Sequence, residues 1–157
     1  MTSDSLAYAI AADGTANRVP LVEAHAHSVG AGLLWLHIDG NSAICSAWLN
    51  EQSGIPVAAI SALTAVETRP RATPIERGVI VNLRGVNMNP EADPEDLVSI
   101  RIWAEAGRVL SVSHRPLLAL DDLIAVVESG RVKDPGDLIV HLADVLTIRL
   151  EAPINEL

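Results

Sequence analysis

Short runs of alternating apolar and polar residues are the strongest pattern in this chain of 157 residues. Three of them lie close together, at residues 79–84, 98–102 and 110–113. Alternation with period 2 is typical of β-strands that bury one face. An acidic segment containing proline, residues 89–96, separates the first two runs, and residues 105–107 form a tight turn between the second and third. This region therefore predicts three half-buried strands of one sheet.

Beyond those runs, the pattern predicts strands mixed with short helices early in the chain and two longer helices late. Pro153 is expected to break the last helix, so that residues 154–157 begin another. This order favours an α/β (α+β) fold, with a mixed sheet and helices on its faces. The other expected strands are 6–10, as a strand or part of a hairpin, 33–39, and 69–75, which would form a hairpin with 79–83. The expected helices are 41–49, 55–66, 119–128 and 134–150.

The net charge of the chain limits the kinds of molecule that it is expected to bind. A net charge of −9 argues against nucleic acid and anionic lipid, because both are bound through clustered cationic side chains. The charge favours cations, although a net acidic surface also simply keeps a protein soluble. Cys45 is the only cysteine, which indicates a reduced, cytoplasmic setting. No uncharged stretch approaches the roughly 20 apolar residues of a spanning helix, so we expect the chain as given to be soluble.

Candidate chemistry is sparse. Ser113-His114 and Ser42 supply hydroxyls and a base, but no Gly-x-Ser-x-Gly elbow surrounds them and no phosphate-binding loop occurs. We therefore expect no enzymatic activity and no required cofactor. Glu23, His25 and His27 would share one face of an extended segment and are candidate ligands for Zn²⁺ or another divalent cation. A solvated loop with two exposed histidines is the simpler interpretation of the same residues.

Sequence motifs spread over nearly the whole chain resemble the cytoplasmic N-terminal domain of the ZntB zinc transporters, within the CorA-like superfamily of divalent-cation transporters. The motifs occur in the order of that family. They are Trp35-Leu36-His37-Ile38-Asp39-Gly40 with Trp48-Leu49, residues 67–71, residues 81–90, residues 92–96, Ser99-Ile100-Arg101-Ile102-Trp103, Arg115-Pro116-Leu117 with Asp121-Asp122, and residues 135–138.

The resemblance implies an α/β/α layered domain that forms the wall of a cytoplasmic funnel in a homopentamer at the inner (plasma) membrane. It divides the chain into a funnel domain, residues 1–150, and the start of a truncated stalk helix, residues 151–157. Contact with the membrane would come only through C-terminal helices that are missing here. The triplet Gly85-Val86-Asn87 matches the Gly-x-Asn pore signature of that superfamily only by coincidence, because no apolar span precedes it, and we interpret it as loop.

The expected function is thus a regulatory and vestibule domain of a divalent-cation transporter, with zinc as the expected ion. Assembly and electrostatic funnelling of cations would be its means of action. The acidic loop residues Glu91, Asp93, Glu95 and Asp96 are expected to strengthen the field, with an ordinary solvated turn as the alternative. A stand-alone binding module for a protein or small ligand is the alternative function. A gene that continues past Leu157 into two apolar spans would favour the transporter.

Overall fold

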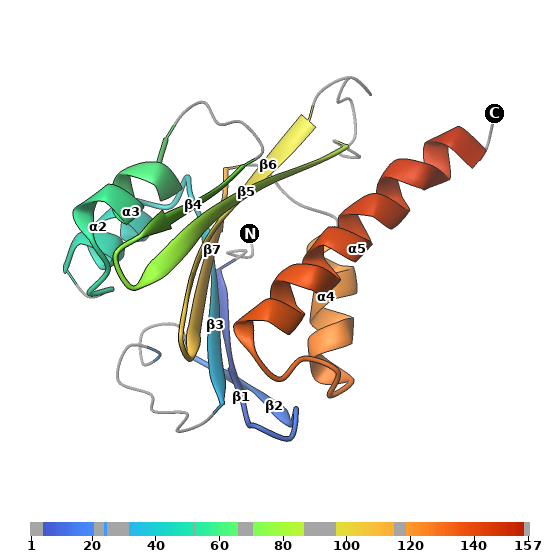
Figure 1. Ribbon diagram of the computed structural model, residues 1–157, viewed down its shortest axis with the longest axis horizontal. Helices are drawn as coiled ribbons and strands as arrows, with labels where there is room; N and C mark the ends of the chain where they lie inside the picture. Colours follow the sequence, from blue (N-terminus) through green and yellow to red (C-terminus); the bar gives the residue numbers. More distant parts are fainter. Residues whose placement is uncertain are drawn as a thin grey trace.

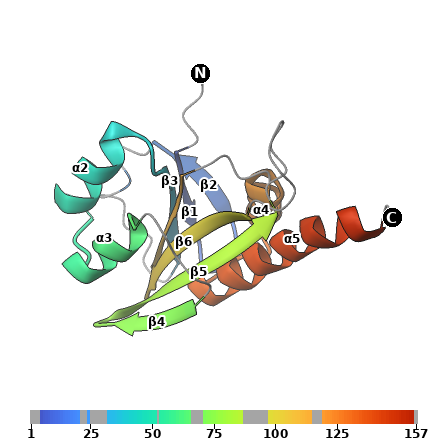
Figure 2. The ribbon, with the colours of Figure 1, turned by 90° about the horizontal axis from the view of Figure 1, so that it is seen from above.

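A seven-stranded mixed sheet lies between two pairs of helices (Figures 1 and 2). The computed structural model describes residues 5–20, 24, 32–51, 53–65, 71–86, 97–114 and 119–155. The strand order is β2-β1-β3-β7-β6-β5-β4. The strands are β1 (Leu6–Ile10), β2 (Ala16–Val19), β3 (Leu33–Asp39), β4 (Arg71–Ile75), β5 (Gly78–Val86), β6 (Leu97–Glu105) and β7 (Arg108–Ser113). The helices are α2 (Ala43–Glu51), α3 (Val57–Leu63), α4 (Ala119–Glu128) and α5 (Pro135–Asn155).

Each face of the sheet has its own apolar core. Helices α2 and α3 cover one face, where Leu36 and Trp103 are fully buried, and α4 and α5 cover the other, where Trp35 and Ile102 are fully buried. Successive residues of a strand point to opposite faces, so β3 contributes to both cores in alternation. The expected class, an α/β/α layered domain with a mixed sheet, is confirmed.

The apolar pattern located most elements well. The bounds of β3 and α4 agree with the predicted ranges, and Leu34, Leu36 and Ile38 share the face of β3 opposite Trp35. Two expectations were wrong at the ends of elements. Helix α5 continues through Pro153 to Asn155, because a proline in the last turn removes only one of the final hydrogen bonds of a helix. Gly85 and Val86 end strand β5 and are not loop.

Several polar positions of the central strands are buried, contrary to the prediction of half-buried strands, whereas Arg84 near the end of β5 is exposed. Arg101 on β6 is 4% exposed, Ser111 on β7 is 2% exposed, and Asn82 on β5 is 2% exposed. Helices cover both faces of the sheet, so a polar side chain on either face lies in the interior and needs a hydrogen-bond partner. The central strands therefore carry polar networks inside the domain.

One such network joins β3 to β7 beneath α4 and α5. The Trp35 Nε1–H donates to Ser111 Oγ at 3.0 Å, and the same oxygen lies 2.8 Å from His37 Nδ1. His37 Nε2 lies 3.2 Å from Ser113 Oγ. A neutral imidazole satisfies both hydroxyl contacts with one N–H and one lone pair. Burial lowers the pKa of His37 to about 4, and the negative charge of Asp39 opposes that shift only in part.

Replacing His37 with Gln should remove part of the acid sensitivity of the fold. The pKa of His37 is lower in the folded chain than the ordinary 6.5, so the unfolded chain binds the proton first and stability falls as the pH drops from 6.5 towards 4. Across this window the wild-type chain should lose about 3 kcal/mol of unfolding free energy through His37 alone. Urea unfolding at about pH 7 and about pH 4.5 measures the loss.

The His37→Gln variant keeps an amide that can bond both serines but cannot titrate, so most of this component should disappear. The His141→Gln variant on α5 controls for removing a histidine and should retain the wild-type loss. An equal pH-dependent loss in the wild-type and His37→Gln chains would contradict the assignment.

Candidate functional site at the carboxyl ends of the central strands

The carboxyl ends of β3 and β7 lie side by side at the middle of the sheet. These two strands pair in parallel, with Asp39 opposite Ser113. From its end, β3 leads into α2 on one face, whereas β7 leads towards α4 on the other face (Figure 1). In open α/β sheets, the place where neighbouring parallel strands send their connections to opposite faces is the usual position of a ligand site. This edge is therefore the candidate site that the topology selects.

Hydrogen bonds of the backbone and of the Asn41 side chain hold the two strand ends together. The Gly40 N–H donates to the Ser113 carbonyl at 2.8 Å, and the Asp39 N–H donates to Ser5 Oγ at 2.9 Å. The Asp39 carboxylate accepts a hydrogen bond from the Asn41 N–H at 3.0 Å, an Asx turn that leads into α2. The Asn41 side-chain amide donates to the His114 carbonyl. The start of α2 is thereby tied to the residue that follows β7.

The imidazole of His114 is the centre of this edge. Arg101 NH1, from β6, lies 2.6 Å from His114 Nδ1. A guanidinium has only donors, so Nδ1 must accept and the proton of the neutral ring sits on Nε2. Burial, and then the charge of Arg101, lower the pKa of His114, while Asp39 opposes the shift. Burial also lowers the pKa of Arg101.

This set of groups is better suited to holding two strands together than to binding a cation. Arg101 NH1 and the Asn41 side-chain amide both donate within the protein, and Asp39 is a carboxylate at this edge. Across the described residues, no group of three or more His, Cys, Asp or Glu side chains is arranged to hold a metal ion. The described part of the edge thus offers no metal centre.

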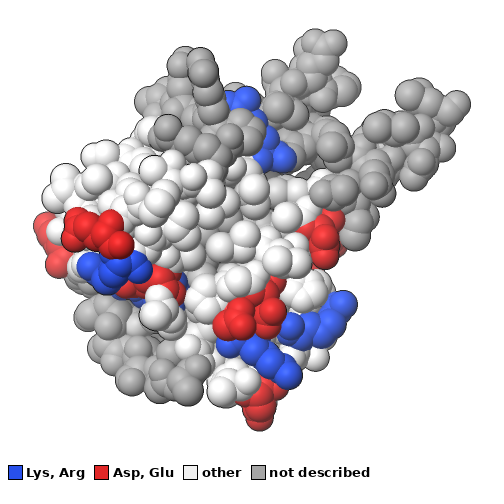
Figure 3. Space-filling view, viewed as in Figure 1, with Lys and Arg blue, Asp and Glu red and all other residues white. Residues whose placement is uncertain are grey.

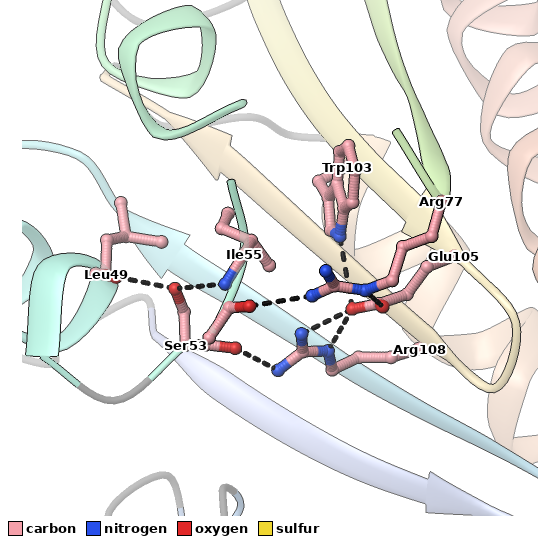
Figure 4. A network of polar contacts seen from close by, with 8 residues as sticks. Leu49, Ser53, Ile55, Arg77, Trp103, Glu105 and Arg108 are labelled. Atoms are coloured by element: carbon pink, nitrogen blue, oxygen red, sulfur yellow. Dashed lines mark hydrogen bonds and ion pairs between the residues drawn. The ribbon is translucent and has the colours of Figure 1, made fainter. Parts of the chain in front are cut away.

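A second polar cluster lies at the opposite end of the sheet, around Glu105 in the β6–β7 turn (Figure 4). The Glu105 carboxylate accepts hydrogen bonds from Arg77 Nε at 2.7 Å and from Arg108 Nε at 2.7 Å. The same arginines donate to the carbonyls of Gly54 and Ser53, at 2.7 Å and 2.6 Å, between α2 and α3. The cluster therefore fastens the α2–α3 layer to two hairpin turns.

The charge of Glu105 is stabilised within this cluster. Burial raises the pKa of Glu105, but the hydrogen bonds from Arg77, Arg108 and Trp103 outweigh burial and leave that pKa below its ordinary value. Arg77 and Arg108 also donate to backbone carbonyls between α2 and α3, which gives the cluster a structural role.

The structure separates the residues of the Ser113-His114 pair. The Ser113 hydroxyl points to the α4–α5 face and bonds His37, whereas the His114 ring contacts Arg101, on the α2–α3 side. These two residues therefore do not form a nucleophile with its base. His37 does contact two hydroxyls, but it is 1% exposed and a weak base.

The predicted metal and cation-attracting residues lie outside the described residues. This holds for Glu23, His25 and His27 and for the acidic loop residues, which are Glu91, Asp93, Glu95 and Asp96. Both sets remain predictions.

The Arg101–His114 contact was not predicted from the sequence. Arg101 occupies the polar side of an alternating strand, a pattern that predicts partial exposure, and the sequence indicates only the role of a base for His114. One signal was available: both Gly40 and His114 directly follow predicted strand ends. Parallel pairing of those strands, which the sequence does not reveal, brings the two residues together.

Comparison with known proteins agrees with this architecture. The family model of the CorA-like Mg²⁺ transporter protein matches residues 30–157. The chain is 40% identical over 124 residues to the divalent cation transporter CmaX of Pseudomonas aeruginosa, covering 78% of this chain and 37% of that relative. It is 31% identical over 124 residues to the zinc transport protein ZntB of Pectobacterium atrosepticum, covering 78% and 38%.

Solved structures show the same fold. The structure of full-length CmaX superposes with a TM-score of 0.89 at 34% identity, covering 99% of this chain and 49% of CmaX. The ZntB cytoplasmic domain from Vibrio parahaemolyticus gives a TM-score of 0.82 at 23% identity, covering 96% and 60%. The chain spans less than half the length of the curated relatives, and none of its described helices is long and apolar enough to cross a membrane. The sequence and the fold together place this chain in the CorA-like Mg²⁺ transporter family.

Proposed function

We propose that this chain is the cytoplasmic vestibule domain of a divalent-cation transporter, in which it acts by assembly and by electrostatic attraction of cations. The observation that carries the proposal is the match to full-length CmaX, with a TM-score of 0.89 over 99% of this chain. Because the chain covers 49% of CmaX, the remainder of a protein of that kind would contain the transport path. Zinc is the proposed ion, by analogy with the ZntB relatives.

The charge of the chain supports attraction of cations. Five copies around one axis, the proposed assembly, would carry a combined charge of about −45. Salt screens such a field over roughly 8 Å at physiological ionic strength, so acidic residues near the ion path would contribute most. On the face in Figure 3, described acidic and basic side chains lie beside one another and do not form one broad acidic surface.

The acidic loop is the segment with the densest negative charge in the sequence. Four of the chain's twenty acidic residues fall within residues 91–96. In the sequence, this segment connects β5, which ends at Val86, to β6, which begins at Leu97. We propose that this loop supplies the local field.

Neutralising the loop should slow cation entry in the full-length protein. We expect the combined change of Glu91 and Glu95 to Gln, and of Asp93 and Asp96 to Asn, to reduce transport at subsaturating zinc about threefold to tenfold at low salt, because a smaller field concentrates fewer cations. The difference should shrink as ionic strength rises. Zinc flux into vesicles containing the full-length protein measures both effects.

A matched control variant removes four negative charges at positions outside the acidic loop. The exposed residues Glu51, Glu76, Asp121 and Asp144 lie on other elements and can be changed to their amides together. This variant should transport more nearly as the wild type does. If both quadruple variants lose the same fraction of flux, the effect belongs to net charge and not to the loop; if neither loses flux, funnelling by these residues is wrong.

Weak metal sensing by Glu23, His25 and His27 is a second part of the proposal, suggested by their alternate spacing. Calorimetric titration of zinc into the 157-residue chain should show binding that weakens at least tenfold in the His25→Ala and His27→Ala variants, because each would remove one ligand. The His141→Ala variant should bind as the wild type does. Unchanged affinity in both loop variants would contradict a site at these residues.

A further inference from the structure

The imidazole of His114, which follows β7, lies between Gly40 at the end of β3 and Arg101 on β6, the two strands that flank β7. A Cβ atom added to Gly40 would lie 2.7 Å from the ring atoms Cδ2 and Nε2, so the ring packs directly on the Gly40 backbone. Arg101 NH1 approaches the ring at Nδ1, at 2.6 Å. The His114 carbonyl accepts a hydrogen bond from the Asn41 amide. The ring and the backbone of His114 are thus both held by residues from other elements.

The contact between Arg101 and His114 requires a neutral ring. The guanidinium is always charged and always a donor, so the lone pair on Nδ1 is the acceptor. A proton on Nδ1 would occupy that lone pair and place two N–H groups and two positive charges 2.6 Å apart. Of the described charged groups, Arg101 on β6 disfavours the imidazolium and Asp39 at the end of β3 favours it, and burial adds to the effect of Arg101.

The position of His114 gives this contact a structural consequence. His114 follows the last residue of β7, and the chain continues from there to α4 and α5, which pack on the opposite face from α2 and α3 (Figure 1). Gly40 and Asn41 bind the backbone of Ser113 and His114, respectively. A displaced ring would loosen the point at which the sheet, α2 and the connection to α4 meet.

We propose that His114 is a proton-sensitive latch: the neutral ring, seated between Gly40 and Arg101, closes the junction of β3 with β7, and protonation expels the ring and opens that junction. The latch is a property of the chain itself. It goes beyond the proposed function and does not depend on which ion a larger protein would carry.

Residue-specific NMR titration of the 157-residue chain, from about pH 7.5 to about pH 4.5, tests the latch directly. The His114 ring should titrate with a midpoint below the ordinary histidine value of about 6.5. The amide signals of Gly40 and Asn41 should shift with the same midpoint, because their partners move with the ring. A His114 midpoint at or above 6.5, or Gly40 and Asn41 signals that do not follow it, would overturn the proposal.

Two variants separate the latch from general acid effects. In His114→Asn, the side-chain oxygen can accept from Arg101 but cannot titrate, so the transition at Gly40 and Asn41 should vanish. In Arg101→Met, the opposing charge is gone, and the proton affinity of His114 should rise at least about threefold. A transition that persists in His114→Asn, or an unchanged His114 midpoint in Arg101→Met, would contradict the latch.

The experiment also includes a control variant that lacks a different histidine, and it does not depend on the folding of His114→Asn. The His141→Asn variant on α5 should keep the wild-type transition at Gly40 and Asn41. His37 is also buried nearby, but its pKa of about 4 lies below the titrated range, and its own ring signals distinguish it from His114. If His114→Asn does not fold, the wild-type titration and the Arg101→Met midpoint still decide the question.

Discussion

The parallel pairing of β3 with β7 is the contact on which the rest of the structure depends. It joins two antiparallel groups, β2-β1-β3 and β7-β6-β5-β4, into one sheet. Among the described strands it is the only parallel pair, and its partners are separated by more than 70 residues along the chain. Because it lies at the centre, both of its faces are covered by helices. A sheet without this pairing would be two smaller units, each with an incomplete core.

Burial of both faces explains where the polar groups of the domain lie. Ser111 and His37 face α4 and α5 from the two central strands and bond each other, which satisfies groups that would otherwise be costly to bury. Arg101 points to the other face and contacts His114. At the opposite end of the sheet, the Glu105 carboxylate accepts hydrogen bonds from Arg77 and Arg108. The polar residues of the central strands thus specify register and orientation, while the apolar residues supply most of the burial.

Hydrophobic alternation predicted the local elements because each strand and helix must bury a face regardless of its neighbours. It therefore located β3 and α4 well. Alternation could not show what covers the other face, so Arg101 and Ser111 were expected to be half-exposed and are buried. It could not reveal the pairing that brings Gly40 to His114, because the two are distant in the chain. The family motifs predicted the layered fold, while the predicted cation residues, such as His25 and Glu91, await experiment.

Hydrogen exchange of the backbone amides tests the central role of the β3–β7 pairing most directly. If the sheet depends on this contact, amides in β3 and β7 should be the slowest to exchange, through unfolding of the whole domain, while those in the edge strands β2 and β4 should exchange at least about a hundredfold faster through local opening. Exchange in β3 and β7 that is as fast as in β2 and β4 would contradict the account, because the two halves of the sheet would then separate without unfolding.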